Sequence, residues 1–205
     1  MYKVLVILVI ALIGTTLPLS AQDTLRIDPP DAPSGPKIED GLWEEIVSNA
    51  GRFGIRAPGY MIEKVDTIKT QLGEMAYHTY FLQSPVKTSD NLFYMVSYCD
   101  YPEGSVHADS TELLEEFFDV TVKESAFSIS GDLVYSNPWE WNDYPGRIWR
   151  VDYLKGEAII KTRAFLVDNR YYSMQTIMLK DKSLNPSSKA FFDSFYLLDQ
   201  EASGN

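Results

Sequence analysis

The sequence predicts an α+β domain with a central antiparallel sheet, and three observations support this fold class. Apolar and polar residues alternate in segments 91–98, 147–154, 157–167 and 170–179, which is typical of strands. Short turns containing Gly or Asp-Asn join the last three segments, as in a β-meander. Residues 110–122 instead carry apolar side chains at helical spacing, so we expect one helix to pack on the sheet.

Residues 1–21 have the layout of a secretory signal peptide. Lys3 gives a short, positively charged start, residues 4–13 are an unbroken apolar run, and small or polar residues lead to Ala21. The apolar run is shorter than the roughly 20 residues that a membrane-spanning helix needs. We therefore expect cleavage near Ala21 and a periplasmic or extracellular protein with no integral membrane segment. Retention of residues 1–21 as an N-terminal anchor is the alternative.

The rest of the chain divides into a linker, one domain and a tail. Residues 22–40 contain four prolines, which favour extended or disordered backbone. Residues 41–199 are long enough for a single domain with a proper hydrophobic core. Residues 200–205 are small and polar, and we expect a flexible tail there.

The charge and the single cysteine limit the classes of function. Acidic residues outnumber basic ones by 29 to 18, and the net charge is −11. Nucleic acids and anionic membrane surfaces repel such a chain, so neither is expected as a partner. Cys99 has no second cysteine to pair with, so packing alone must hold the fold. We expect Cys99 to be a core thiol at a strand end, with an exposed, reactive thiol as the alternative.

The N-terminal half of the domain is mostly strand. Residues 51–58 alternate apolar and polar side chains, and residues 61–70 form a strand that turns at 71–74 into a second strand from Met75. Residues 91–98 carry bulky side chains on both faces. This pattern predicts a central strand that is covered on both sides.

A helix follows these strands. Asp109 can cap it, and Glu112 completes a start that resembles a capping box. The buried face of the helix is expected to consist of Leu113, Leu114, Phe117, Phe118 and Thr121.

The C-terminal half opens with an aromatic segment, residues 137–146, that contains Pro138 and Pro145. Because proline is unfavourable within a sheet, we expect this segment to be a loop rather than regular strand. After the three meander strands, Asn185 can cap a short helix that has Pro186 in its first turn.

Several short stretches, in this order along residues 43–198, resemble the PsbP-like superfamily. This superfamily contains the photosystem II extrinsic protein and mostly uncharacterised secreted bacterial relatives. The resemblance implies an α/β/α sandwich with a central antiparallel sheet, and it implies little about function. No metal or partner site of the superfamily can be matched to positions in this chain. The stretches that carry the resemblance are Gly51-Arg52-Phe53 with Ala57-Pro58-Gly59, Val96 to Pro102, Tyr144 to Arg147, Arg163 with Asn169 to Tyr172, and Phe191 to Phe195.

Common catalytic and cofactor motifs are absent from the sequence, including CxxC, HExxH, GxxxxGK[ST] and GxSxG. We therefore assign no catalytic residue, no cofactor and no metal ligand. His78 is expected to make a structural hydrogen bond on a sheet face. His107 lies in the acidic loop 100–109, where a divalent-metal site is the alternative to a solvated loop.

Three arginines, Arg147, Arg150 and Arg163, are expected on neighbouring strands of the sheet. We expect them to pair with acids such as Asp152. An anion site formed by their guanidinium groups is the alternative.

These features favour a secreted, non-enzymatic binding or accessory domain whose partner is an envelope protein or a glycan. The expected binding residues are Trp139, Trp141, Tyr144 and Arg147. At least one of the three rings is expected to be exposed on the predicted loop, because Trp and Tyr often anchor interfaces. Arg147 is expected to hold that loop to the sheet.

Two other functions remain as alternatives. One is a glycan- or metal-dependent hydrolase that uses Glu140 and Asp143 as paired carboxylates. The other is a purely structural envelope protein.

Overall fold

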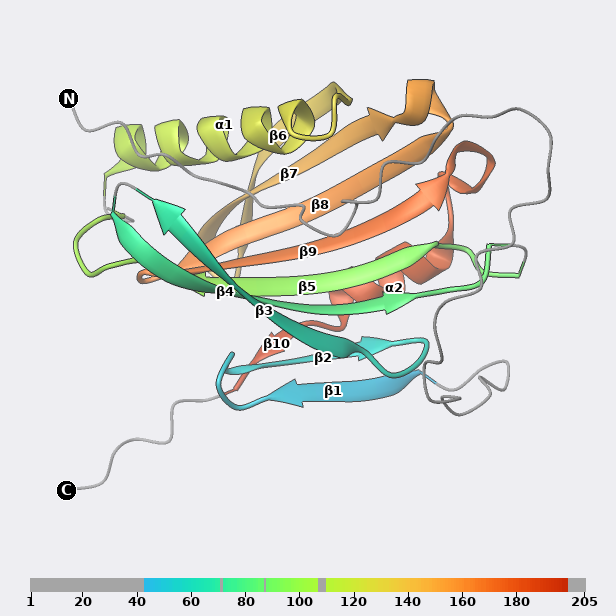
Figure 1. The fold of residues 1–205 in the computed structure, drawn as a ribbon, viewed down its shortest axis with the longest axis horizontal. Coiled ribbons are helices and arrows are strands. Elements are labelled where there is room, and N and C mark those ends of the chain that lie inside the picture. Colours follow the sequence, from blue (N-terminus) through green and yellow to red (C-terminus); the bar gives the residue numbers. More distant parts are fainter. Residues whose placement is uncertain (1–42, 71, 87, 107–109, 199–205) are drawn as a thin grey trace.

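The computed structural model describes residues 43–70, 72–86, 88–106 and 110–198, and Figure 1 shows their arrangement. The predicted signal peptide, linker and tail lie outside the described residues, as does the predicted helix cap, Asp109.

A seven-stranded sheet forms the centre of the fold. Its strand order is β3-β4-β5-β9-β8-β7-β6, and every neighbouring pair is antiparallel. The predicted central antiparallel sheet and the α+β class are therefore confirmed. The strands are β3 (Ile62–Thr70), β4 (Gly73–Gln83), β5 (Phe93–Asp100), β6 (Asp132–Trp141), β7 (Tyr144–Tyr153), β8 (Ala158–Val167) and β9 (Arg170–Leu179).

Strand β5 is a central strand, as its two apolar faces predict. It lies between β4 and β9, and its residues from Tyr94 to Cys99 are all buried. Strands β8 and β9 are joined by a tight hairpin turn in which Asp168 has a φ of 54°. A 3-10 turn, η1 (Leu154–Gly156), joins β7 to β8, and a second one, η2 (Lys180–Lys182), follows β9.

Helix α1 (Thr111–Phe127) covers one face of the sheet (Figure 1). It extends beyond the predicted end at residue 122. The buried residues of its last turn, Ser125 and Ala126, are small, so they do not continue the pattern of large apolar side chains. The Ser125 hydroxyl donates to the Val122 carbonyl at 2.7 Å, so its burial is satisfied within the helix. The prediction that Leu113 belongs to the buried face was wrong, since Leu113 is 44% exposed.

The opposite face carries helix α2 (Pro186–Asp193) and a small second sheet (Figure 1). The small sheet has the strand order β1-β2-β10, with β1 (Glu44–Ser48), β2 (Phe53–Ala57) and β10 (Tyr196–Leu197). Asn185 caps α2, as predicted, by accepting a hydrogen bond from the Ser188 amide at 2.8 Å.

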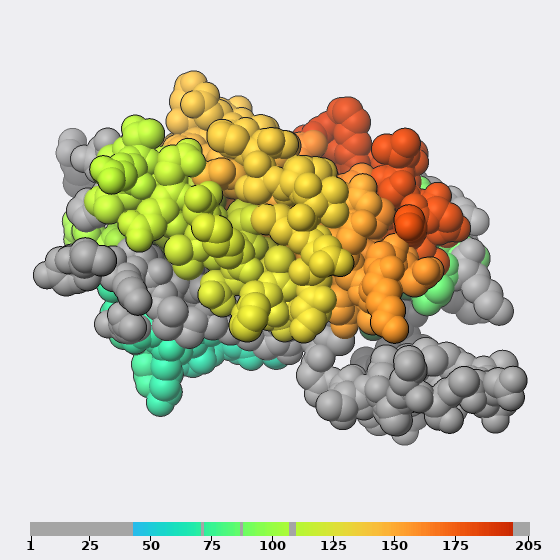
Figure 2. Space-filling model, turned by 90° about the horizontal axis from the view of Figure 1, so that it is seen from above, coloured from blue at the N-terminus to red at the C-terminus, as the bar shows by residue number. Residues whose placement is uncertain are grey.

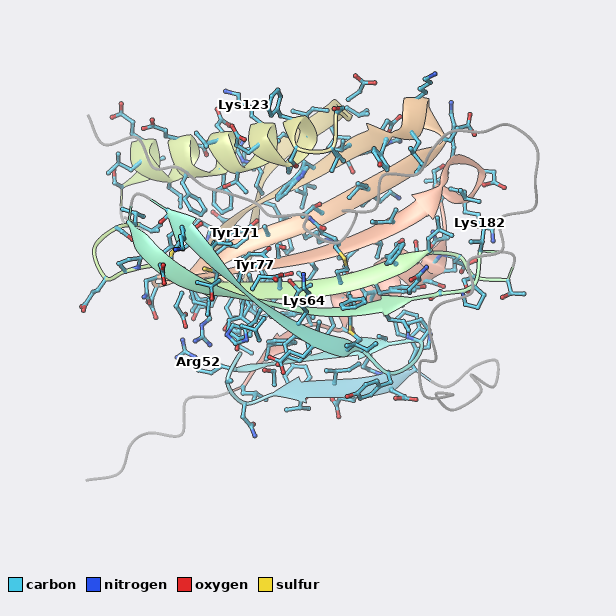
Figure 3. The ribbon with its side chains drawn as sticks, in the orientation of Figure 1. Arg52, Lys64, Tyr77, Lys123, Tyr171 and Lys182 are labelled. Carbon is cyan, nitrogen blue, oxygen red and sulfur yellow. The ribbon has the colours of Figure 1, made fainter. Side chains whose placement is uncertain are left out.

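Each face of the large sheet has its own hydrophobic core. The first core lies under α1 and includes Phe117, Phe118 and the fully buried Trp149. Tyr77 and Tyr171 lie near one another in this core, on strands that flank β5 (Figure 3). The second core lies between the large sheet, the small sheet and α2. It includes Phe53, Phe165, Tyr172, Phe191 and Phe195.

Among the strands that the structure describes, β6 is one edge of the large sheet and pairs with β7 alone. Seen from above, α1 and the hairpin of β6 and β7 form much of the visible surface (Figure 2). Helix α1 contacts both of these strands. The other face of the β6–β7 hairpin therefore remains available to α2 and the second core.

Candidate functional site

The aromatic segment 137–146 is a β-hairpin, so the prediction that it forms an irregular loop was wrong. Strand β6 continues to Trp141, and β7 begins at Tyr144. Both residues of the turn between them have positive φ, 47° at Asn142 and 66° at Asp143, as a type I′ hairpin turn requires.

The two prolines are tolerated because neither occupies a ladder position that needs its N–H. Pro138 lies on the edge strand β6, which has a partner on one side only. Pro145 precedes Gly146, the residue at which β7 begins to pair with β8. The sequence contains the prolines, but it does not show that they leave the sheet's hydrogen bonds intact. That depends on which strand lies at the edge of the sheet.

The three rings of the hairpin all face the second core. Trp139, Trp141 and Tyr144 are partly buried and pack against that core. Trp141 stacks on Phe165 at 4.9 Å between ring centroids and meets Phe195 edge-on at 5.4 Å. The rings therefore have a packing role, and their proposed role in binding stays a prediction.

Arg147 lies on the opposite face of the sheet from the three rings. Its side chain is 7% exposed, donates to Glu115 and lies 3.5 Å from Asp119. The guanidinium also lies 6.0 Å from the centre of the Phe118 ring. The expectation that Arg147 holds the hairpin to the sheet was wrong: these contacts hold α1 to the sheet, because Arg147 points toward the helix.

The two carboxylates of the hydrolase alternative do not share a cavity. Glu140 is on β6 and Asp143 is in the turn, and both are exposed. By strand alternation, Glu140 points away from the face that carries Trp139 and Trp141. Neither carboxylate lines the cavity described below.

The two histidines were the other candidate residues in the sequence. His78 lies 3.1 Å from a Glu63 carboxylate oxygen and stacks on Tyr98 at 4.4 Å, so the predicted structural hydrogen bond is confirmed. His107 lies outside the described residues. Within the described part of the chain, no three His, Cys, Asp or Glu side chains gather as a metal site would require.

Cys99 is a buried core thiol, as predicted. Burial is the main cause that raises its pKa to about 12, and the nearby Asp100 carboxylate adds to it. The thiol is therefore protonated at neutral pH and unreactive in the folded protein.

A cavity of about 370 Å³ lies where α2 meets strands β6, β7 and β8. We call it the α2 cavity. Its apolar lining includes Tyr135 from β6, Ile148 from β7 and Phe192 from α2. Its basic lining residues are Lys161, Arg163 and Lys189.

Arg163 is the most firmly held cation of the α2 cavity. Its guanidinium lies 4.8 Å from the centre of the Phe192 ring and 5.5 Å from that of Trp139. It also donates a 2.9 Å hydrogen bond to Asp193. Two aromatic rings and a carboxylate thus restrict the rotamers of one arginine, and this lowers the entropic cost of binding a ligand there.

Lys161 lies two residues before Arg163, on the same face of β8. Its ammonium donates to the Ser183 carbonyl at 2.5 Å. Burial lowers the pKa of Lys161, and the nearby Arg150 guanidinium lowers it further. Arg150 itself makes two hydrogen bonds with Asp152, at 2.6 and 3.0 Å, so this predicted pair is confirmed.

Lys189 is the exposed rim residue of the cavity, and Asp193 lies one turn further along α2. The Lys189 ammonium and the Arg163 guanidinium both donate to the Asp193 carboxylate. The hydrogen bond from Lys189 is the largest cause that lowers the pKa of Asp193, and the one from Arg163 adds to it.

A polar network fixes α2 on the sheet and so defines the walls of the cavity. The Ser188 hydroxyl donates to the Asn91 side chain at 2.8 Å, and it lies 3.2 Å from the Thr176 hydroxyl. Asn91 and Asn185 also share a hydrogen bond of 3.1 Å. These contacts hold α2 in place against the sheet.

Part of this site follows from patterns that the sequence contains. Lys161, Arg163 and Phe165 alternate along β8, which places the two cations on the face of the second core. Lys189 and Phe192 are three residues apart on α2, which places them on one side of that helix. Arg147 and Arg150 are also three residues apart, but on a strand this spacing places them on opposite faces of the sheet. Arg147 is therefore separated from Arg150 and Arg163.

Comparisons with known proteins bear on the fold. No protein-family model matches the chain, and no curated protein matches it. Among solved structures, it is similar to cyanobacterial PsbP (CyanoP) from Synechocystis sp. PCC 6803, with a TM-score of 0.50 and 11% sequence identity. The match covers 81% of this chain and 99% of the cyanobacterial protein.

The chain has a PsbP-like fold. At this identity the likeness concerns the fold alone, and it confirms the resemblance that the short sequence stretches predict. In the described part of this PsbP-like domain, no helix has the length and apolar character needed to span a membrane.

Proposed function

We propose that this chain is an exported, non-enzymatic binding domain that holds its ligand in the α2 cavity. The observation that carries this proposal is a cavity whose lining combines apolar and basic side chains. Ligand sites typically combine a mostly apolar lining with a few fixed polar groups in a volume of roughly 300–1,000 Å³. The signal-peptide pattern of residues 1–21 supports export to the periplasm or beyond.

The ligand is a small molecule, or a group that projects from an envelope protein or a glycan. Trp139 is the hairpin ring nearest to such a ligand, because it lies over Arg163 at the cavity. We also infer that the domain is an α/β/α sandwich with α1 and α2 as its outer layers. Packing of the two helices against separate cores supports this arrangement.

The hydrolase alternative receives less support from the geometry. Its two carboxylates, Glu140 and Asp143, lie on the exposed hairpin and away from the cavity lining. A glycosidase needs two carboxyl groups on either side of a bound sugar. Binding without chemistry is therefore the better explanation of the α2 cavity.

Affinity selection with the full chain tests the proposal. The purified protein is incubated with an extract of its native envelope, and retained compounds are identified by mass spectrometry. We expect Ile148→Trp, which fills the cavity from its floor, to abolish retention of at least one compound. The matched control is Leu133→Trp, an exposed position on β6 outside the cavity lining, which should retain it.

Thermal unfolding of both variants separates loss of binding from loss of folding. Lys189→Glu provides a second variant, because the Lys189 side chain is 78% exposed and its replacement leaves the core intact. If the wild type and all three variants retain the same compounds, the cavity is not the binding site.

A further inference from the structure

The α2 cavity has a local charge opposite to that of the whole chain. Four cations, Arg150, Lys161, Arg163 and Lys189, lie in or beside it. Among the described residues that pair with them, the acids are Asp152 and Asp193. Two positive charges thus remain in excess here, in a chain whose net charge is −11.

The hydrogen-bond donors of Lys161 and Arg163 are not all used by acceptors of the described residues. An ammonium group has three protons and a guanidinium has five. Lys161 directs one of them to the Ser183 carbonyl, and Arg163 directs one of them to Asp193. A ligand anion placed between the two cations would receive hydrogen bonds from both. It would also offset the mutual repulsion of Lys161 and Arg150.

The apolar side chains that lie beside these cations require an apolar group in the ligand. Tyr135, Ile148 and Phe192 line the cavity, and Tyr135 is 39% exposed on the edge strand. Leu184, which is 94% exposed, stands at the margin of the same cavity. A fully hydrated anion would leave these side chains without a partner, so the ligand must bring apolar surface as well as charge.

The volume of the cavity and the net charge of the chain limit the class of ligand further. A cavity of about 370 Å³ accepts a small molecule rather than a polymer. The negative field of the whole chain opposes ligands with many negative charges. The local excess of two positive charges is enough to attract one carboxylate and too small to overcome this field for a polyanion.

Resting on the proposed function of the α2 cavity, we propose that its ligand is an organic carboxylate with an apolar body. The carboxylate lies between Lys161 and Arg163, and the apolar body lies against Tyr135, Ile148 and Phe192. Lys189 at the rim increases the attraction without contacting the apolar body.

Isothermal titration calorimetry with the full chain tests this assignment, and octanoate is the probe. We expect octanoate to bind at least tenfold more tightly than octanol, which lacks the charge, and than acetate, which lacks the apolar body. Added salt should weaken octanoate binding because it screens the charge at the rim. Inorganic phosphate should not compete at equal concentration.

Two variants complete the experiment. Lys161→Gln keeps most of the side-chain length, and it should weaken octanoate binding by at least tenfold with no loss of melting temperature. Lys189→Gln, at an exposed position, should weaken it by a smaller factor. The matched control is Lys123→Gln on α1, on the far side of the sheet, which should bind as the wild type does.

The outcomes separate this inference from the proposed function. If octanol binds as well as octanoate and Ile148→Trp abolishes both, the cavity is a ligand site but its ligand is not a carboxylate. Equal octanoate binding by the wild type and Lys161→Gln overturns the inference in the same way. An absence of octanoate binding at millimolar concentration also overturns it, while the selection experiment on the native extract still decides the proposed function.

Discussion

Asp193 is the carboxylate that two cations of the α2 cavity share. It accepts hydrogen bonds from Lys189 and Arg163, and these contacts lower its pKa below the ordinary value of 3.8. A carboxylate whose pKa is lower in the folded protein stabilises the fold above its unfolded pKa. That contribution disappears as the pH falls through the folded pKa.

We therefore expect Asp193→Asn to lower the free energy of unfolding at neutral pH and to have no effect in strong acid. The loss at neutral pH should be below about 1 kcal/mol, because the side chain is 41% exposed and solvent screens the pair. Urea titrations of both proteins across the acidic range measure this. If the free energies of unfolding of the wild type and Asp193→Asn differ by the same amount at every pH, packing rather than charge explains the effect.

Cys99 gives a second prediction at the scale of single residues. Because the thiol is buried and its pKa is raised to about 12, iodoacetamide should not modify the folded protein at mildly alkaline pH. Unfolding in urea should make modification complete, which mass spectrometry detects. Rapid modification without urea would show that the strand end opens.

Helix α1 is the element whose orientation is most easily tested. Phe117 is 2% exposed and lies in the first core, whereas Glu116 faces solvent. Phe117→Ala should lower the free energy of unfolding by about 3–5 kcal/mol, the usual range for a buried aromatic ring. Glu116→Ala should change it by less than about 0.5 kcal/mol. Equal losses in denaturant titrations would mean that the helix faces the other way.

The β6–β7 hairpin shows how an element depends on its neighbours. Gly146 begins the pairing of β7 with β8, and a Cβ atom there would lie 2.4 Å from the Ala164 carbonyl oxygen. The next residue, Arg147, turns to the opposite face and binds α1. Strand β7 therefore serves both sides of the sheet, with Tyr144 packed against the second core and Arg147 directed toward α1.

At the scale of the whole molecule, the two cores share one sheet. Strands β8 and β9 supply residues to both, such as Leu166 to the first core and Phe165 to the second. Loss of either core would expose one face of every central strand. We therefore expect a single cooperative unfolding transition, with the same midpoint by far-UV and near-UV circular dichroism.

Variants in each core check this cooperativity. Phe117→Ala and Phe191→Ala should lower the midpoint measured by both probes together, although one residue lies under α1 and the other on α2. Two separated transitions in either variant would show that the cores unfold independently.

Much of the fold could be predicted because it depends on local patterns. Alternation along 91–98 and 157–179 specifies strands, and the Asp168-Asn169 turn specifies a hairpin. Asn185 and Pro186 specify the start of α2 through capping alone. The order of short stretches also predicted the PsbP-like fold.

The hairpin at 137–146 and the α2 cavity required the tertiary structure. Whether proline breaks a strand depends on whether that strand has one neighbour or two, and this is a property of the assembled sheet. The cavity joins Lys161 and Arg163 on β8 to Lys189 on α2.

By itself, the sequence therefore determined the charge, the fold class and most of the strands and helices of this protein, but not the hairpin at 137–146. The tertiary structure decided which side chains meet. Periodicity places a residue on a face of its own element, whereas a binding site arises from faces that packing brings together across distant parts of the chain.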